Sequence, residues 1–174
     1  MGRDHLVEGR LSGYDPDVGA ALWRLEDARA RTLELVSTVG PTLVDESVEG
    51  NSIGTILYHI ALIEADWLYT DILGTDPPEW LISLLPHDHR DEHGVLTRVT
   101  GMPLATHLAS LAAVRTELLA ELRSMDSADL HRPRNLDDYD VSPAWVLHHL
   151  AQHEAEHRAE IGAAVARLSG ERDR

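Results

Sequence analysis

Apolar residues recur at intervals of three and four along four long stretches of the chain. This spacing places them on one face of an α-helix, so the pattern predicts four amphipathic helices. The predicted helices cover Pro16–Val39, Ser52–Leu73, Pro103–Arg123 and Pro143–Leu168. No segment alternates apolar and polar residues over a length that would favour a β-sheet. The sequence therefore predicts an all-α protein.

Residues that start and stop helices flank these stretches. Asp15, Ser52 and Ser142 stand where an N-cap side chain would accept a hydrogen bond from the first turn. Gly74 and Gly170 follow the second and fourth stretches and are expected to stop them. The helix boundaries are thus predicted from both periodicity and capping chemistry.

Two connections between the predicted helices are long, at about 74–102 and 124–141. Connections of this length usually contain short helices or line a site, and 80–85 is predicted to be such a helix. A chain of 174 residues suits one domain. We therefore expect a four-helix bundle over 15–174 with short extra helices in the connections, preceded by a loosely ordered segment 1–14.

Composition narrows the function. The chain has no cysteine, which excludes disulfides, thiolate metal sites and an internal thiol nucleophile. Thirty acidic residues against 15 basic ones give a net charge of −15, which repels nucleic-acid phosphates and anionic membranes. The sequence shows neither a signal peptide nor an apolar run long enough to cross a bilayer. We expect a cytoplasmic protein that acts on a small molecule.

The chain carries 11 histidines, three of which stand four residues apart in the last predicted helix. Residues four apart lie on one helical face with Cβ atoms about 5–6 Å apart. At 100° per residue, His153 and His157 fall within the apolar stripe, whereas His149 lies at its edge and is expected to meet solvent. Burying two imidazoles is costly unless hydrogen bonds or a metal ion compensate. Both explanations remain open on spacing alone.

His59 lies between Ile56 and Ile63 and borders the apolar stripe of the second predicted helix. Taken alone, such a histidine is more often structural than a metal ligand. Three imidazoles from two facing helices would suit Zn²⁺, Ni²⁺ or a similar borderline ion. Three protein ligands would leave a coordination position open, as catalytic metal sites do.

Two segments resemble the DinB/YfiT-like superfamily. NSIGTILYHIALIEADWL resembles the superfamily's histidine-bearing helix, with matches at His59, Glu64 and Trp67. SPAWVLHHLAQHEAEHRAEI resembles its last helix, with matches at His153, His157, Arg158 and Ile161. This chain has Ala159-Glu160 where the superfamily often has Gly-Gln, and that departure bears on the substrate pocket more than on the metal.

The resemblance implies a four-helix bundle, a homodimer and a divalent metal, Zn or Ni, held by His59, His153 and His157. Relatives in the superfamily transfer low-molecular-weight thiols such as mycothiol or bacillithiol. The leading hypothesis is therefore a thiol-dependent S-transferase that acts on small electrophiles, with the thiol as cosubstrate. One alternative is a hydrolase that uses metal-bound water. Another is a non-catalytic metal-binding stress protein.

Several polar residues near the predicted centre have two interpretations. Glu156 and Glu160 are candidates to accept a hydrogen bond from a ring N–H of a ligand histidine, although solvated surface positions are the favoured interpretation for both. Arg158 is a candidate for a substrate carboxylate, but a pair with Glu154 at i−4 is favoured. His107 is a candidate to line the substrate pocket.

Other conspicuous residues have plainer interpretations. The segment with His87, His89 and His93 is interpreted as a solvated loop, with closure over the metal's open face as the alternative. Tyr139 and Trp145, near the start of the last predicted helix, are expected to be packing residues.

Overall fold

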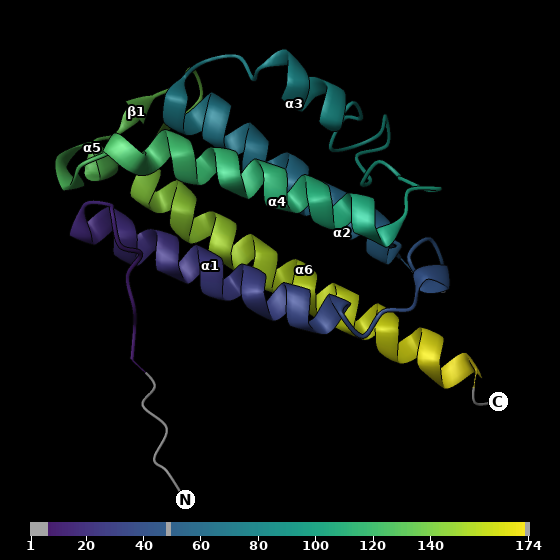
Figure 1. Cartoon of the computed structure of the whole chain (residues 1–174). Coiled ribbons are helices and arrows are strands. Elements are labelled where there is room, and N and C mark those ends of the chain that lie inside the picture. Colours follow the sequence, from purple (N-terminus) through teal and green to yellow (C-terminus); the bar gives the residue numbers. More distant parts are fainter. Residues whose placement is uncertain (1–6, 48–49, 173–174) are drawn as a thin grey trace, which may run out of the picture.

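The computed structural model describes residues 7–47 and 50–172, and four long helices dominate it (Figure 1). These helices are α1 (Pro16–Val36), α2 (Ile53–Asp66), α4 (Leu104–Glu121) and α6 (Pro143–Arg172). The predicted all-α fold class is confirmed. Within the described part of the chain, no helix combines the length and apolar content needed to cross a bilayer.

The long helices form a bundle in which neighbours do not simply alternate in direction. α1 packs along α6, and α2 packs against both α4 and α6. In Figure 1, α1 and α6 run one way and α2 and α4 run the other. Since α2 and α4 are parallel neighbours, the chain between them must return along the bundle. The long connection does this and carries the predicted short helix, α3 (Glu79–Leu84).

Shorter elements complete the connections. They are η1 (Pro41–Leu43), η2 (Trp67–Leu73), η3 (Leu122–Ser124), α5 (Ser127–His131), β1 (Arg134–Asn135) and β2 (Asp140–Val141). The two strands pair antiparallel. At two residues each they are too short to produce an alternating pattern, which is why the sequence did not predict them. η2 is a π-helix that continues α2 without a break, so the second predicted helix is one continuous helix whose last turns are π-helical.

The structure has helix caps at most of the positions where the sequence predicted them. The side chains of Asp15, Ser52 and Ser142 each accept a first-turn backbone N–H, at 2.9, 3.2 and 3.3 Å respectively. Gly74 ends η2 in the left-handed conformation, with φ of 65°. The predicted stop at Gly170 is wrong, because α6 continues to Arg172. A single glycine costs about 1 kcal/mol inside a helix, which does not suffice to end one.

Part of the N-terminal segment predicted to be loose contacts the bundle. The backbone N–H of Leu11 donates to the Gly19 carbonyl at 3.0 Å, and the Tyr14 hydroxyl donates to the Leu119 carbonyl at 3.0 Å. These bonds attach the end of the segment to α1 and α4. Residues 1–6 of the segment lie outside the described residues.

The core surrounds α2. Eleven of its fourteen residues are buried, including the polar side chains of Thr55, His59 and Glu64. A helix covered on most sides does not show one clear apolar stripe. Periodicity alone therefore could not say which polar residues of α2 point toward α6.

Candidate metal centre

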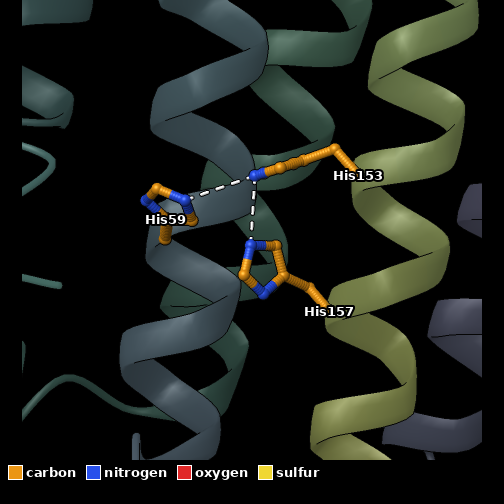
Figure 2. Close-up of side chains that lie close together, drawn as sticks. All are labelled: His59, His153 and His157. Atoms are coloured by element: carbon orange, nitrogen blue, oxygen red, sulfur yellow. Dashed lines mark hydrogen bonds between the residues drawn. The ribbon is translucent and has the colours of Figure 1, made fainter.

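Three histidine side chains from two helices converge on one point (Figure 2). The Nε2 atom of His153 lies 3.2 Å from Nε2 of His59 and 3.0 Å from Nε2 of His157. One ring nitrogen from each residue lies within 4.8 Å of the others. Among the described residues, no other group of three histidine or carboxylate side chains has this geometry. The structure thus brings together the three histidines that the sequence singled out.

Helix geometry explains the convergence. His153 and His157 stand one turn apart on the face of α6 that packs against α2, while His59 projects from α2 toward them (Figure 2). His59 is buried, with 6% of its surface exposed, and the two α6 histidines are half-buried. The site is consequently open on one side and closed by α2 on the other.

Burial keeps the imidazoles of His59 and His153 neutral. Burial lowers the pKa of His59 to about 4, and a positive charge on His157 would lower it further. Burial likewise lowers the pKa of His153 to about 3, assisted by the charges of His157 and His59. Neutral rings keep a lone pair on one nitrogen, which is the form that binds metal ions.

The donor set fits a divalent cation. Ring nitrogens at metal–nitrogen distances of about 2.0–2.1 Å would lie roughly 3.0–3.4 Å from one another. The Nε2–Nε2 distances of 3.0 and 3.2 Å agree with that separation. Nε2 of His153 faces two other ring nitrogens rather than an oxygen. A cation would satisfy all three lone pairs at once, whereas a proton shared between two rings leaves the third without a partner.

One carboxylate contacts the cluster. Oε2 of Glu160 lies 3.3 Å from Nδ1 of His157, which is the position that orients a ring with its Nε2 lone pair free. Glu156, the other candidate, is exposed and accepts a hydrogen bond from Nε2 of Gln152 at 2.9 Å. The structure therefore places Glu160, but not Glu156, against a histidine of the cluster.

The two candidate pocket residues lie elsewhere. Nη1 of Arg158 donates to the Ala28 carbonyl on α1 at 3.3 Å, so the favoured pair with Glu154 is wrong. His107 is 1% exposed and packs in the core beside Gly54, five residues before His59. Neither residue is brought to the three histidines.

The histidine-rich loop passes close to the cluster. His87 and His89 are exposed, as expected of a solvated loop. The backbone N–H of His87 donates to the Tyr58 hydroxyl at 2.8 Å, which anchors the loop beside the residue that precedes His59. The charges of Arg90 and His89 contribute to the low pKa of His59, after burial and His157.

A buried charge network links the four long helices next to the histidines. The network consists of Arg29 on α1, Glu64 on α2, Arg115 on α4 and Glu154 on α6, each at most 6% exposed. Arg29 donates to Glu64 and to Glu154 at 2.7 Å each. Arg115 donates to Glu64 at 2.7 and 2.9 Å. Two guanidinium groups thus face two carboxylates in the interior, and Arg115 also pairs with the partly exposed Glu26 on α1 at 2.5 Å.

This network holds together the helices that carry the three histidines. Glu154 adjoins His153 in sequence, and Glu64 lies on the same helix as His59. Through the two arginines the network joins α2 to α6 directly beside the cluster. Sequence reasoning missed it, although a signal existed, because Arg29 and Glu154 occupy positions where the three–four spacing calls for apolar residues.

Aromatic rings continue the line of histidines toward the start of α6. The ring of His149 lies 4.9 Å from that of Trp67 and stacks on Trp145 at 5.0 Å with 12° between the planes. His149 is half-buried by these rings rather than fully solvated. Tyr139 and Trp145, expected to be packing residues, are 47% and 49% exposed, although Trp145 also packs against Trp67 with 5.5 Å between the ring centroids.

Comparison with known proteins identifies the family. The DinB superfamily model matches residues 24–161, which is most of the chain and includes all three histidines. A search of curated proteins finds no match. Together with the helical bundle and the histidine cluster, the match shows that the chain belongs to the DinB superfamily.

Proposed function

We propose that this protein is a metal-dependent enzyme that transfers a low-molecular-weight thiol to a small electrophile. The observation that supports it best is the convergence of the Nε2 atoms of His59, His153 and His157, with adjacent contacts of 3.0 and 3.2 Å. A set of three protein ligands is typical of catalytic rather than structural metal sites. Imidazole ligands favour Zn²⁺ or Ni²⁺.

The chemistry suits a thiol. Bound at this site, a divalent ion would supply a Lewis acid that lowers the pKa of a thiol or of water. Because the chain has no cysteine, the sulfur must come from a cosubstrate such as mycothiol or bacillithiol. In the transfer, the thiol loses its proton, its sulfur bonds to the electrophilic carbon, and the leaving group departs with the bonding electron pair.

The chain's own residues prepare the site for this reaction. Burial keeps His59 and His153 neutral, so their lone pairs are available at neutral pH. Glu160 holds the ring of His157 through Nδ1. The charge network of Arg29, Glu64, Arg115 and Glu154 fixes the spacing between α2 and α6.

The first test is metal binding by protein purified without a histidine tag. We expect the unaltered chain to bind a single Zn²⁺ or Ni²⁺ ion. His153→Ala should abolish this binding while the far-ultraviolet circular dichroism stays unchanged. The matched control is His148→Ala, an exposed histidine on the same helix, which should bind as the unaltered chain does. Failure of the unaltered chain to take up either metal would favour a non-catalytic role.

The second test is turnover by the metal-loaded protein against a panel of electrophiles, with and without added thiols. We expect product only when a thiol is present, and none with His153→Ala. Turnover that proceeds equally well without thiol would replace the transferase by a hydrolase that uses water.

A further inference from the structure

A cavity of about 560 Å³ opens where η2, β2 and the start of α6 meet. Its wall includes Trp67, Pro133, Tyr139, Val141, Ser142 and Trp145. The volume lies within the range of small-molecule sites, about 300–1,000 Å³, and such sites are mainly apolar. In Figure 1 this is the end of the bundle that carries α5 and β1.

A continuous line of rings joins this cavity to the three histidines. Trp145, His149 and His153 stand four residues apart on one face of α6. The ring centroids of Trp145 and His149 lie 5.0 Å apart, and those of His149 and His153 lie 6.1 Å apart. Trp67 faces this line of rings from the other helix, two helical turns after His59, and its ring centroid lies 4.9 Å from that of His149. Eight residues of helix separate Trp145 from His153, which corresponds to about 12 Å.

Hydrogen bonding within the protein fixes part of the cavity wall. The Tyr139 hydroxyl donates to Oδ1 of Asp71 at 2.6 Å, and Asp71 is only 3% exposed, so this bond fixes the exposed tyrosine ring. Trp67 begins the π-helix η2, and widened turns of this kind occur frequently at functional sites. Trp145 nevertheless leaves 49% of its surface exposed.

The wall is mainly apolar, and its acidic and basic side chains are Asp140 and His131. Asp140 is the acidic residue there, and its Oδ1 already accepts a hydrogen bond from Nδ2 of Asn135 at 2.7 Å. Much of the remaining surface consists of the faces and edges of indole and phenol rings. Such surfaces gain most from covering an apolar group.

We propose that this cavity is a subsite for an uncharged aromatic or aliphatic group of the substrate. The inference rests on the proposed function, because the reactive end of the same molecule would lie at His59, His153 and His157. The separation between the two places selects elongated substrates, whose reactive and apolar ends lie about 12 Å apart. Substrates with only a short chain would reach the histidines without filling the cavity.

The test uses hydroxamates, which chelate divalent metals, with the full-length Zn²⁺-loaded protein. Acetohydroxamate is compared with hydroxamates that carry a terminal phenyl group on spacers of increasing length. We expect binding to tighten by about tenfold or more once the spacer spans the two places, from burial of one phenyl ring. Isothermal titration calorimetry measures each dissociation constant.

Two variants locate the effect. Trp145→Ala should remove the gain of the long phenyl compounds while leaving the metal content and the affinity for acetohydroxamate unchanged. Trp80→Ala is the matched control, because Trp80 is 43% exposed on α3 and lies outside the cavity wall. It should keep the full gain. The spacer series with the unaltered protein tests the proposal even if the Trp145 variant fails to fold.

The outcomes separate the subsite from the metal centre. Acetohydroxamate binding with no dependence on the terminal group, or an undiminished gain in Trp145→Ala, would overturn the subsite alone. Tighter binding of a trimethylammonium terminus than of its tert-butyl isostere would overturn the uncharged class. A protein that takes up no metal and binds no hydroxamate would overturn the proposed function together with the subsite that depends on it.

Discussion

Replacing Glu64 by glutamine tests the buried charge network that joins the four long helices. Glu64 is 2% exposed and accepts three hydrogen bonds from Arg29 and Arg115, at 2.7, 2.7 and 2.9 Å. Glutamine keeps the shape of the side chain but removes its charge. It also turns an amide N–H₂ toward guanidinium groups that can only donate.

The expected loss of stability is large. Removing one partner of a buried ion pair costs about 3–5 kcal/mol, because the remaining charge stays buried without compensation. Solvent does not screen the interaction, since Arg29, Arg115 and Glu154 are each at most 6% exposed. For a domain with a free energy of unfolding of about 5–15 kcal/mol, this is a substantial fraction.

The assay is urea unfolding followed by far-ultraviolet circular dichroism. We expect Glu64→Gln to lower the free energy of unfolding by about 3–5 kcal/mol. The control is Glu156→Gln, at an exposed carboxylate on α6, which should change it by about 0.5 kcal/mol or less. A loss for Glu64→Gln no larger than that of one ordinary hydrogen bond, about 1 kcal/mol, would refute the reasoning.

The same variant has a defined pH dependence. Burial alone would raise the pKa of Glu64, but the charges and hydrogen bonds of Arg115 and Arg29 outweigh it and hold the pKa below the ordinary 4.5. Glu64 therefore contributes its full stability above pH 4.5 and loses it as the pH falls through the lower folded-state pKa. Glutamine does not titrate. The stability difference between the two proteins should consequently shrink below pH 4.5 and stay constant above it.

Three further predictions test the packing around the site. A Cβ on Gly54 would lie 2.9 Å from Nε2 of His107, so Gly54→Ala should destabilise the protein by about 1–3 kcal/mol. A Cβ on Gly162 would meet its nearest neighbour only at 3.8 Å, so Gly162→Ala should stabilise the protein by about 0.5–1 kcal/mol, and thermal unfolding measures both changes. Tyr139→Phe removes the donor to buried Asp71 and should cost about 1–2 kcal/mol in urea unfolding. The homodimer implied by the family resemblance should give twice the chain mass in light scattering, and a monomer at all concentrations would contradict it.

The sequence by itself determined the long helices and one half of the candidate centre. The three–four spacing of apolar residues and the caps at Asp15, Ser52 and Ser142 act within a few residues, so they can be read without a fold. His153 and His157 belong to the same class of information, because a helix fixes the relation between residues four apart. His59 needed the family resemblance, since its own helix is buried on most sides.

Only the tertiary structure decided what lies between helices. Which side chains meet there depends on how far each helix is shifted along and rotated about its axis, and that follows from the packing of all four together. Because of this packing, Arg29 and Glu154, which occupy positions in apolar stripes, pair with each other in a buried network. The same packing places Arg158 against the Ala28 carbonyl on α1 rather than against Glu154. It also leaves Trp145 half-exposed on a cavity wall rather than in the core.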